Sequence, residues 1–217
     1  MTDVGSATDR SPFGAPEPGV APAEAIAAGL VIGADGLARC SWGASAPEYL
    51  AYHDKEWGQP VRTDDGIFER MSLEAFQSGL SWLTILRKRE SFRNAFAGFS
   101  IPAVAAFSEA DATRLMADPG IVRNRMKVDA ALHNARVAAD LPAGLAALLW
   151  SYAPEPRPRP ASRAEVPPLT PESKAMAKDL KKRGFKFVGP TTAYALMQAT
   201  GMVDDHLAGC HVPPTRV

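Results

Sequence analysis

Residues 40–58 read CSWGASAPEYLAYHDKEWG and bring one cysteine, one histidine and four large aromatic side chains into one short stretch. Ser45 is expected to cap a helix here, with Pro47 in its first turn and Gly58 as its stop. Aromatic rings can stack on a planar ligand, so a helix face built from them is unusual for a core. That face would contain, at helical spacing, Tyr49, Tyr52, His53 and Glu56. We therefore expect this helix to bind a ligand as well as to pack.

The composition limits the class of protein. The 217 residues suffice for one well-buried domain or two small lobes, and the net charge is zero. Residues 1–38 contain five acidic residues and one arginine, so the rest of the chain has a net charge of +4. A nucleic-acid partner is therefore not excluded by the overall neutrality of the chain. No run approaches the roughly 18 apolar residues of a membrane span, and no signal-peptide pattern opens the chain. A cytoplasmic protein without a membrane partner is expected.

The chain is expected to form one all-α domain over residues 39–217, preceded by a flexible tail at 1–38. Half of the tail is Ala, Gly and Pro, which offer little to bury. Seven prolines between 154 and 171 predict an extended surface loop. Apolar residues recur at helical spacing elsewhere, and no sustained strand is evident. Helices are expected over about 63–79, 81–89, 122–139, 141–152, 172–183 and 190–200.

Two pairs of metal-binding residue types stand near the two ends of this domain. Twelve residues separate Cys40 from His53, whereas His206 and Cys210 have a spacing that places both side chains on one side of a helical turn. Two cysteines and two histidines are a donor set typical of a closed, tetrahedral zinc site. The alternative is that the cysteines are small core side chains and the histidines bond to the backbone. A disulfide is not expected in a reducing compartment.

A basic helix over 172–183, the turn GFKFVG at 184–189 and a helix over 190–200 predict two helices joined by a tight hairpin. Free backbone N–H groups at the start of the second helix can bind a phosphate, and nearby basic side chains add charge. Such a contact positions a duplex without reading its sequence. The alternative is a solvated basic helix followed by an ordinary turn.

Glu74 falls on the apolar face of the helix expected over 63–79, together with Ile67 and Met71. A buried carboxylate costs several kcal/mol unless a partner compensates it. If Tyr52 and Trp82 flank it, the partner would be a flat cation or an edge of hydrogen-bond donors. The alternative is a pairing with a nearby arginine, or a place at the solvent edge of the helix.

From Arg39 to about Pro213, the chain resembles 3-methyladenine DNA glycosylase I, a family of bacterial alkylation-repair enzymes in the helix-hairpin-helix glycosylase superfamily. The matching segments fall in the family's order and with its spacing, and together they span about four fifths of the chain. They are RCSWG, YLAYHDKEWG, LEAFQSGLSWLTILRKRESFR, GIVRNRMK, KKRGFKFVGPTTAYALMQA and DDHLAGC. The resemblance implies the helix-hairpin-helix glycosylase fold, with a structural zinc ion that joins the two ends of the domain.

The resemblance also implies roles for the matching residues. Glu74 would accept hydrogen bonds from a flipped base, Trp82 would stack on that base and Tyr52 would contact it. The rest of the aromatic lining would be Trp42, Tyr49 and Trp57. The zinc ligands would be Cys40, His53, His206 and Cys210. The hairpin residues that hold the DNA backbone would be Gly184, Lys186, Val188 and Gly189.

The reaction implied is hydrolysis of the N-glycosidic bond of 3-methyladenine in double-stranded DNA, by a monomeric and monofunctional enzyme that leaves an abasic site. 3-Methylguanine is a second candidate lesion. Related glycosylases use an aspartate after the hairpin, and Asp204 lies near that place; its alternative role is a cap or a partner of the zinc site. Two other interpretations stay open: a zinc-stabilised DNA-binding module without activity, and a glycosylase for a bulkier N3-alkylpurine, with Phe76 and Gln77 shaping the pocket.

Overall fold

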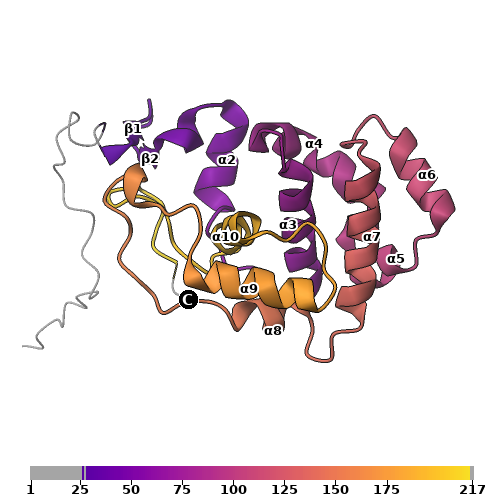
Figure 1. Ribbon diagram of the computed structural model, residues 1–217. Helices are drawn as coiled ribbons and strands as arrows, with labels where there is room; N and C mark the ends of the chain where they lie inside the picture. The colour runs from indigo at the N-terminus through magenta and orange to yellow at the C-terminus, as the bar shows by residue number, and fades with distance from the viewer. Residues whose placement is uncertain (1–25, 27, 216–217) are drawn as a thin grey trace, which may run out of the picture.

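Two capped helices form the centre of the molecule. The computed structural model describes residues 26 and 28–215, and Figure 1 shows α3 (Asp64–Gln77) upright in the middle with α4 (Trp82–Ala95) beside it. The Thr63 side chain accepts the backbone N–H of Gly66 at the start of α3, and Ser81 caps α4 in the same way. Each cap stabilises its helix by about 1 kcal/mol. The predicted starts of both helices are confirmed, although α4 runs six residues beyond the expected end.

The remaining helices surround this pair. Phe76 of α3 lies in the core with Phe92, its ring centroid 4.7 Å away. The central helices bury large apolar side chains, as the spacing of these residues predicts. Around them stand α5 (Ile101–Ala105), α6 (Glu109–Ala117), α7 (Arg125–Ala139), α8 (Leu145–Trp150), α9 (Pro171–Lys182) and α10 (Pro190–Ala199). The mostly helical architecture predicted from the sequence is confirmed. Among the described residues, none of these helices is long and apolar enough to cross a lipid bilayer.

A small hairpin at the start of the domain differs from the prediction. Strands β1 (Leu30–Ile32) and β2 (Ala38–Cys40) pair antiparallel, with Leu30 opposite Cys40. Leu30 is only 3% exposed and packs against Leu207, so the predicted tail ends earlier than residue 38. Three-residue strands are too short to show a sustained alternating pattern. Residues 1–25, most of the predicted tail, lie outside the described residues.

The aromatic stretch at 40–58 folds as two short pieces. The helical turn η1 (Ser41–Ala44) comes first, followed by α2 (Pro47–Lys55). Ser45 is not the cap of α2, because its hydroxyl donates to the carbonyl oxygen of Trp42 and closes the preceding turn. The helix also ends at Lys55, three residues before the predicted stop. Gly43 is required here, since a side chain would come within 2.5 Å of the His53 ring.

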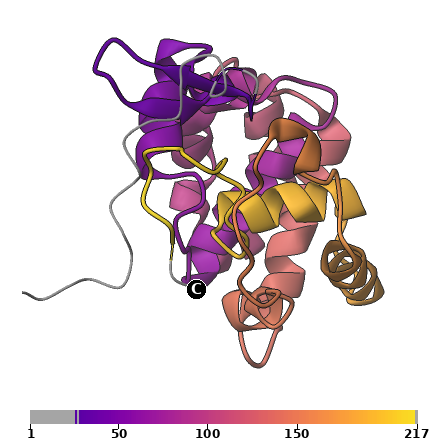
Figure 2. The same cartoon turned by 90° about the vertical axis from the view of Figure 1, so that its left-hand side faces the viewer.

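The C-terminal segment returns to the beginning of the domain. Figures 1 and 2 show the final yellow segment beside the indigo hairpin and α2. The backbone N–H of His211 donates to the carbonyl oxygen of Ala38 over 2.8 Å. The loop at 154–170 is irregular apart from the turn η3 (Arg163–Glu165), as its prolines predict. Arg159 on this loop is nevertheless fixed by Asp204, so the loop is tied to the C-terminal segment.

Candidate functional site

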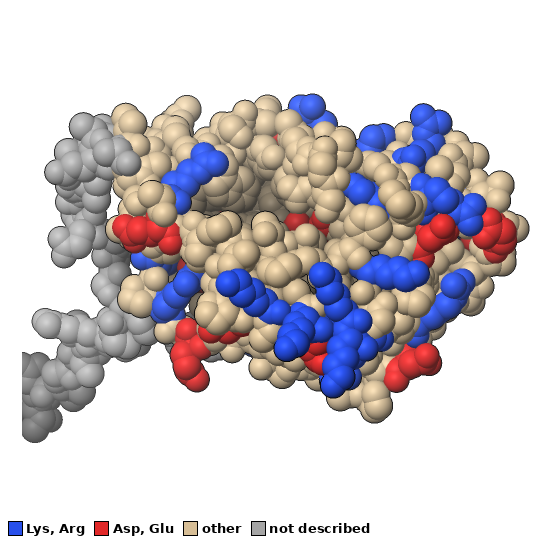
Figure 3. All heavy atoms as spheres, in the orientation of Figure 1, with Lys and Arg blue, Asp and Glu red and all other residues tan. Residues whose placement is uncertain are grey.

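A cavity of about 260 Å³ opens between the aromatic stretch and the central helices. In the space-filling view it lies at the hollow between α2 above and α10 below (Figure 3). Lysine and arginine side chains follow the surface over α9, below the hollow. The cavity is lined by Trp42, Ser45, Tyr49, Tyr52, Trp57, Glu74, Gln77, Trp82, Ala195 and Gln198. It therefore brings together all six residues that the sequence analysis named for base binding.

Glu74 is the acidic group of this cavity. It is 6% exposed, and no hydrogen bond or ion pair holds its carboxylate within residues 28–215. Burial raises the pKa of Glu74 to about 8, while the charge of Arg70 one helical turn earlier opposes that rise. An unsatisfied carboxylate facing a cavity is costly, and a ligand that donates hydrogen bonds or bears positive charge would relieve that cost.

Aromatic rings enclose the carboxylate. The ring centroid of Tyr52, which is 3% exposed, lies 5.4 Å from that of Trp82. Trp42 and Trp57 meet edge-on with centroids 4.9 Å apart, and Tyr49 meets Trp42 at 5.7 Å. The indole N–H of Trp82 is buried and has no acceptor among the described residues. The arrangement suits a flat, electron-poor ring system that can stack and accept a hydrogen bond.

Two residues of α10 complete the lining and were missed by the sequence analysis. Ala195 and Gln198 lie on the cavity side of that helix. The signal that would have indicated Gln198 is an uncharged polar residue on a helix that is otherwise apolar. Phe76, by contrast, does not shape the cavity, because it is fully buried in the core; of the two predicted specificity residues, only Gln77 lines it.

The aspartates after α10 have separate partners. Asp204 accepts from Arg159 and from the backbone N–H of His206, and it is absent from the cavity lining. Its position thus favours the alternative role, a partner of the histidine segment. Asp205 is the more buried of the two and accepts from Gln198 over 2.8 Å. Tyr194 and Arg157 also donate to it, so Asp205 holds Gln198 in place at the cavity.

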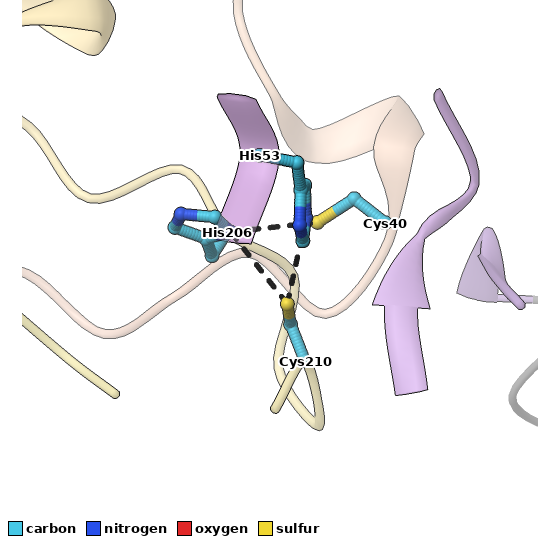
Figure 4. Close-up of side chains that lie close together, drawn as sticks. All are labelled: Cys40, His53, His206 and Cys210. Atoms are coloured by element: carbon cyan, nitrogen blue, oxygen red, sulfur yellow. Dashed lines mark hydrogen bonds between the residues drawn. The ribbon is translucent and has the colours of Figure 1, made fainter. Parts of the chain in front are cut away.

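The four predicted metal ligands converge in the interior (Figure 4). Their ligand atoms all lie within 4.8 Å of one another, and the Sγ of Cys210 lies 3.7 Å from Nε2 of His53 and 3.6 Å from Nδ1 of His206. A tetrahedral site with zinc-like bond lengths places neighbouring sulfur and nitrogen ligands about 3.6 Å apart. The four side chains therefore have the geometry and chemistry to hold a metal ion. They are Cys40, His53, His206 and Cys210.

Each histidine of this cluster uses its other ring nitrogen to bond an oxygen. Nδ1 of His53 lies 2.8 Å from Asp54, and Nε2 of His206 lies 3.2 Å from the carbonyl oxygen of Trp57. Such bonds fix the ring and its tautomer, as is usual around protein metal sites. The segment with His206 and Cys210 is irregular, so the predicted helical turn is wrong although the convergence is right. The tight turn is closed by a bond from Cys210 N–H to the carbonyl of Leu207.

The predicted hairpin between α9 and α10 is present. The four residues predicted to hold the DNA backbone differ in whether their backbone N–H already has an acceptor in the protein. The backbone N–H of Gly184 donates to Lys181, and that of Lys186 donates to the Asn134 side chain over 2.8 Å. Within the described chain, the N–H groups of Val188 and Gly189 have no protein acceptor. Gly184 needs its glycine, since its φ is 98°. Of the four named residues, Val188 and Gly189 therefore have free backbone donors, while Lys186 offers its exposed side chain.

Comparisons with known proteins agree with this geometry. Residues 42–213 match the model of a family described as methyladenine glycosylase. DNA-3-methyladenine glycosylase 1 of Escherichia coli (strain K12) is 44% identical over 179 residues, which are 80% of this chain and 96% of that protein. DNA-3-methyladenine glycosylase of Haemophilus influenzae is 42% identical over 178 residues, 79% and 96% of the two chains. A Staphylococcus aureus structure showing how 3-methyladenine DNA glycosylase I recognises 3-methyladenine superposes with a TM-score of 0.78 at 35% identity, covering 82% and 98%.

Proposed function

The chain belongs to the methyladenine glycosylase family, and we propose that it hydrolyses the N-glycosidic bond of 3-methyladenine in alkylated DNA. The observation that supports this most directly is the buried Glu74 carboxylate inside an aromatic cavity. Methylation at N3 makes adenine cationic in DNA, and such a base both needs a counter-charge and stacks well on aromatic rings. Unmodified adenine is neutral and gains less from the same cavity.

The division of labour follows from the chemistry of the substrate. A base must leave the duplex to enter a cavity of this kind, and alkylation weakens its pairing and lowers that cost. Water then adds to C1′ of the sugar and releases a proton to the solvent, and the electron pair of the N-glycosidic bond leaves with the base, which becomes neutral. Because a cationic base is already a good leaving group, the protein needs mainly to hold it and to admit water. Glu74, Tyr52 and Trp82 would do this, with the base enclosed by Trp42, Tyr49 and Trp57.

The enzyme is monofunctional in this proposal. Lysine is absent from the residues that line the cavity in the described chain, so no amine is placed to attack the sugar and cleave the strand. The hairpin would hold the strand through the free N–H groups of Val188 and Gly189, with Lys186 adding charge and Gly184 allowing the turn. These contacts involve phosphates and no bases, so recognition would depend on the damage rather than on the sequence.

The metal would be zinc in a structural role. Four protein ligands close a tetrahedral site and leave no position for a reacting water, which is typical of structural rather than catalytic zinc. When bound, the ion would supply a fixed link between β2, α2 and the segment that follows α10. Both histidines are oriented for this by Asp54 and by the carbonyl of Trp57. The link would fix the position of the cavity-lining aromatic residues of the 40–58 stretch relative to the hairpin between α9 and α10.

The test is release of free base from DNA methylated with an alkylating agent, measured by chromatography under single-turnover conditions. The wild type is expected to release 3-methyladenine, and Glu74→Gln is expected to slow release at least tenfold. Equal rates for the two proteins would refute the assignment of Glu74. No release by the wild type, together with retained DNA binding, would favour the non-catalytic binding module instead.

A further inference from the structure

A pair of arginines stands behind the cavity, outside the set of residues that would contact the base. Arg70 is on α3, one turn before Glu74, and Arg89 is on α4. The Arg70 side chain is 11% exposed, which is deep for a guanidinium. Its carbon Cζ lies 6.0 Å from the ring centroid of Tyr52, one of the aromatic rings that line the cavity.

Glu56 joins the two arginines. Its carboxylate accepts one bond from Arg70 over 3.1 Å and two bonds from Arg89. Burial alone would raise the pKa of Glu56, yet the two arginines bring it below its usual value. Glu56 is therefore ionised, and it is shared by two positive charges.

The charges of this network do not balance without Glu74. Arg70 and Arg89 contribute two positive charges and Glu56 contributes one negative charge, which leaves one buried positive charge. The NH1 group of Arg70 is also buried and has no acceptor in the described chain. An uncompensated buried charge is costly, and the carboxylate of Glu74 at i+4 on the same helix is the group that can neutralise it.

We propose that Arg70, held by Glu56 and Arg89, is a positioning residue that sets the charge of Glu74 and thereby the pH range in which the cavity accepts a cationic purine. The second half of this proposal rests on the proposed function, whereas the first half concerns the protein alone. The groups that face Glu74 from the surrounding elements are consistent with it. Tyr52 from α2 stays protonated because burial raises its pKa, and α10 contributes only the uncharged Ala195 and Gln198.

Arg70 limits how far burial raises the pKa of Glu74. A carboxyl group in an apolar cavity without a nearby cation would hold its proton far above neutral pH. Arg70 opposes this, and the remaining rise is small enough for a bound cationic base to displace the proton. Arg70 touches no reacting atom in this scheme; it acts through Glu74.

Direct titration of Glu74 provides the test. The protein is prepared with ¹³C-labelled glutamate carboxyl groups, and the Glu74 resonance is identified by its absence in Glu74→Gln. We expect Arg70→Met to raise the titration midpoint of Glu74 by about 1 to 3 pH units, and Arg70→Lys to restore most of the wild-type value. Arg70→Gln is a second neutral variant in case the methionine variant does not fold. Arg93→Met removes another arginine that links α3 and α4 through Glu69, and it should leave the midpoint unchanged.

Base release from methylated DNA provides the second measurement. The acid limb of the pH profile should move upward in Arg70→Met by the same number of units, so that release near pH 7 falls at least tenfold and recovers only as the pH approaches the raised midpoint. In a Glu74→Gln background, Arg70→Met should cause no further shift. Identical Glu74 midpoints in wild type and Arg70→Met would overturn the proposal. A shifted midpoint without base release by the wild type would refute the proposed function and leave the role of Arg70 standing.

Discussion

The imidazole of His206 packs edge-on against the indole of Trp57, with ring centroids 4.7 Å apart and Nε2 of the histidine 3.2 Å from the tryptophan carbonyl oxygen. His206 belongs to the Cys/His cluster that could hold a metal ion, and Trp57 lines the cavity. His53 and Trp42 form a second pair of this kind, with centroids 5.1 Å apart. The cluster and the cavity thus share a wall, and a disturbance of one should be measurable in the other.

Loss of the metal should therefore alter the aromatic wall. We expect one equivalent of zinc per chain by elemental analysis, and loss of the metal in Cys40→Ser. The melting temperature should fall by about 5 °C or more, because the bound ion stabilises only the folded chain. Near-ultraviolet circular dichroism should change as Trp42 and Trp57 lose their fixed packing. His133→Ala is the control, since His133 bonds to the carbonyl of Gly184 outside the cluster; equal zinc contents in all three proteins would contradict the assignment.

Glu74 should make stability depend on pH in an unusual direction. Its pKa is about 8 in the folded chain, above its value of 4.5 when unfolded, so the folded state binds the proton more tightly. The contribution of protonated Glu74 to the free energy of unfolding is complete below pH 4.5 and is lost as the pH rises through 8. Glu74→Gln should be more stable than the wild type at pH 9, by at most about 5 kcal/mol, with the difference vanishing near pH 4. Urea unfolding at both pH values measures this. The exposed Glu90→Gln should show no such dependence.

The hairpin should contribute to DNA affinity through charge as well as through its backbone. Replacing Lys186 by alanine should weaken binding to undamaged duplex, and the slope of log K against log salt should become shallower by about one. Fluorescence anisotropy over a range of salt concentrations measures both quantities. Lys55→Ala, at an exposed position at the end of α2, is the matched control. An unchanged slope in Lys186→Ala would show that this side chain does not reach a phosphate.

Lys127 should fix the turn between α3 and α4. Its buried ammonium donates to the carbonyl oxygens of Phe76 and Ser78, at the end of the helix that contains Glu74. Lys127→Met removes both bonds and should cost about 1 to 3 kcal/mol in urea unfolding. Because Gln77 and Trp82 flank the turn, base release should also slow.

A second lysine separates stability from function. Lys88→Met removes two lysine-to-carbonyl bonds, to Pro119 and Gly120, in a more exposed turn that does not line the cavity. It should lower stability by a smaller amount and leave base release unchanged. Equal effects of the two variants on base release would mean that the turn at Ser78 has no special influence on the cavity.

The sequence indicated the helices and the site better than it indicated how the pieces connect. The starts of α3 and α4 were recognisable because helix capping is a local interaction, and Glu74 stood out as a charge on an apolar face. The hydrogen bond that identifies Asp205, rather than Asp204, as the partner of Gln198 depends on how a loop turns. The two hydrogen bonds between the Lys186 backbone and the Asn134 side chain join residues that are 52 positions apart. Contacts of this range leave no periodic signal in one sequence.

The four candidate metal ligands would also impose an order on folding during biosynthesis. Cys40 and His53 emerge from the ribosome first, whereas His206 and Cys210 follow more than 150 positions later. Until then the nascent chain holds half a binding site, and the strand at β2 lacks the C-terminal segment that covers it. Long-range closure of this kind slows folding. The domain would thus close only after Cys210 has been made, and a ribosome that stopped before it would release a chain without the complete ligand set.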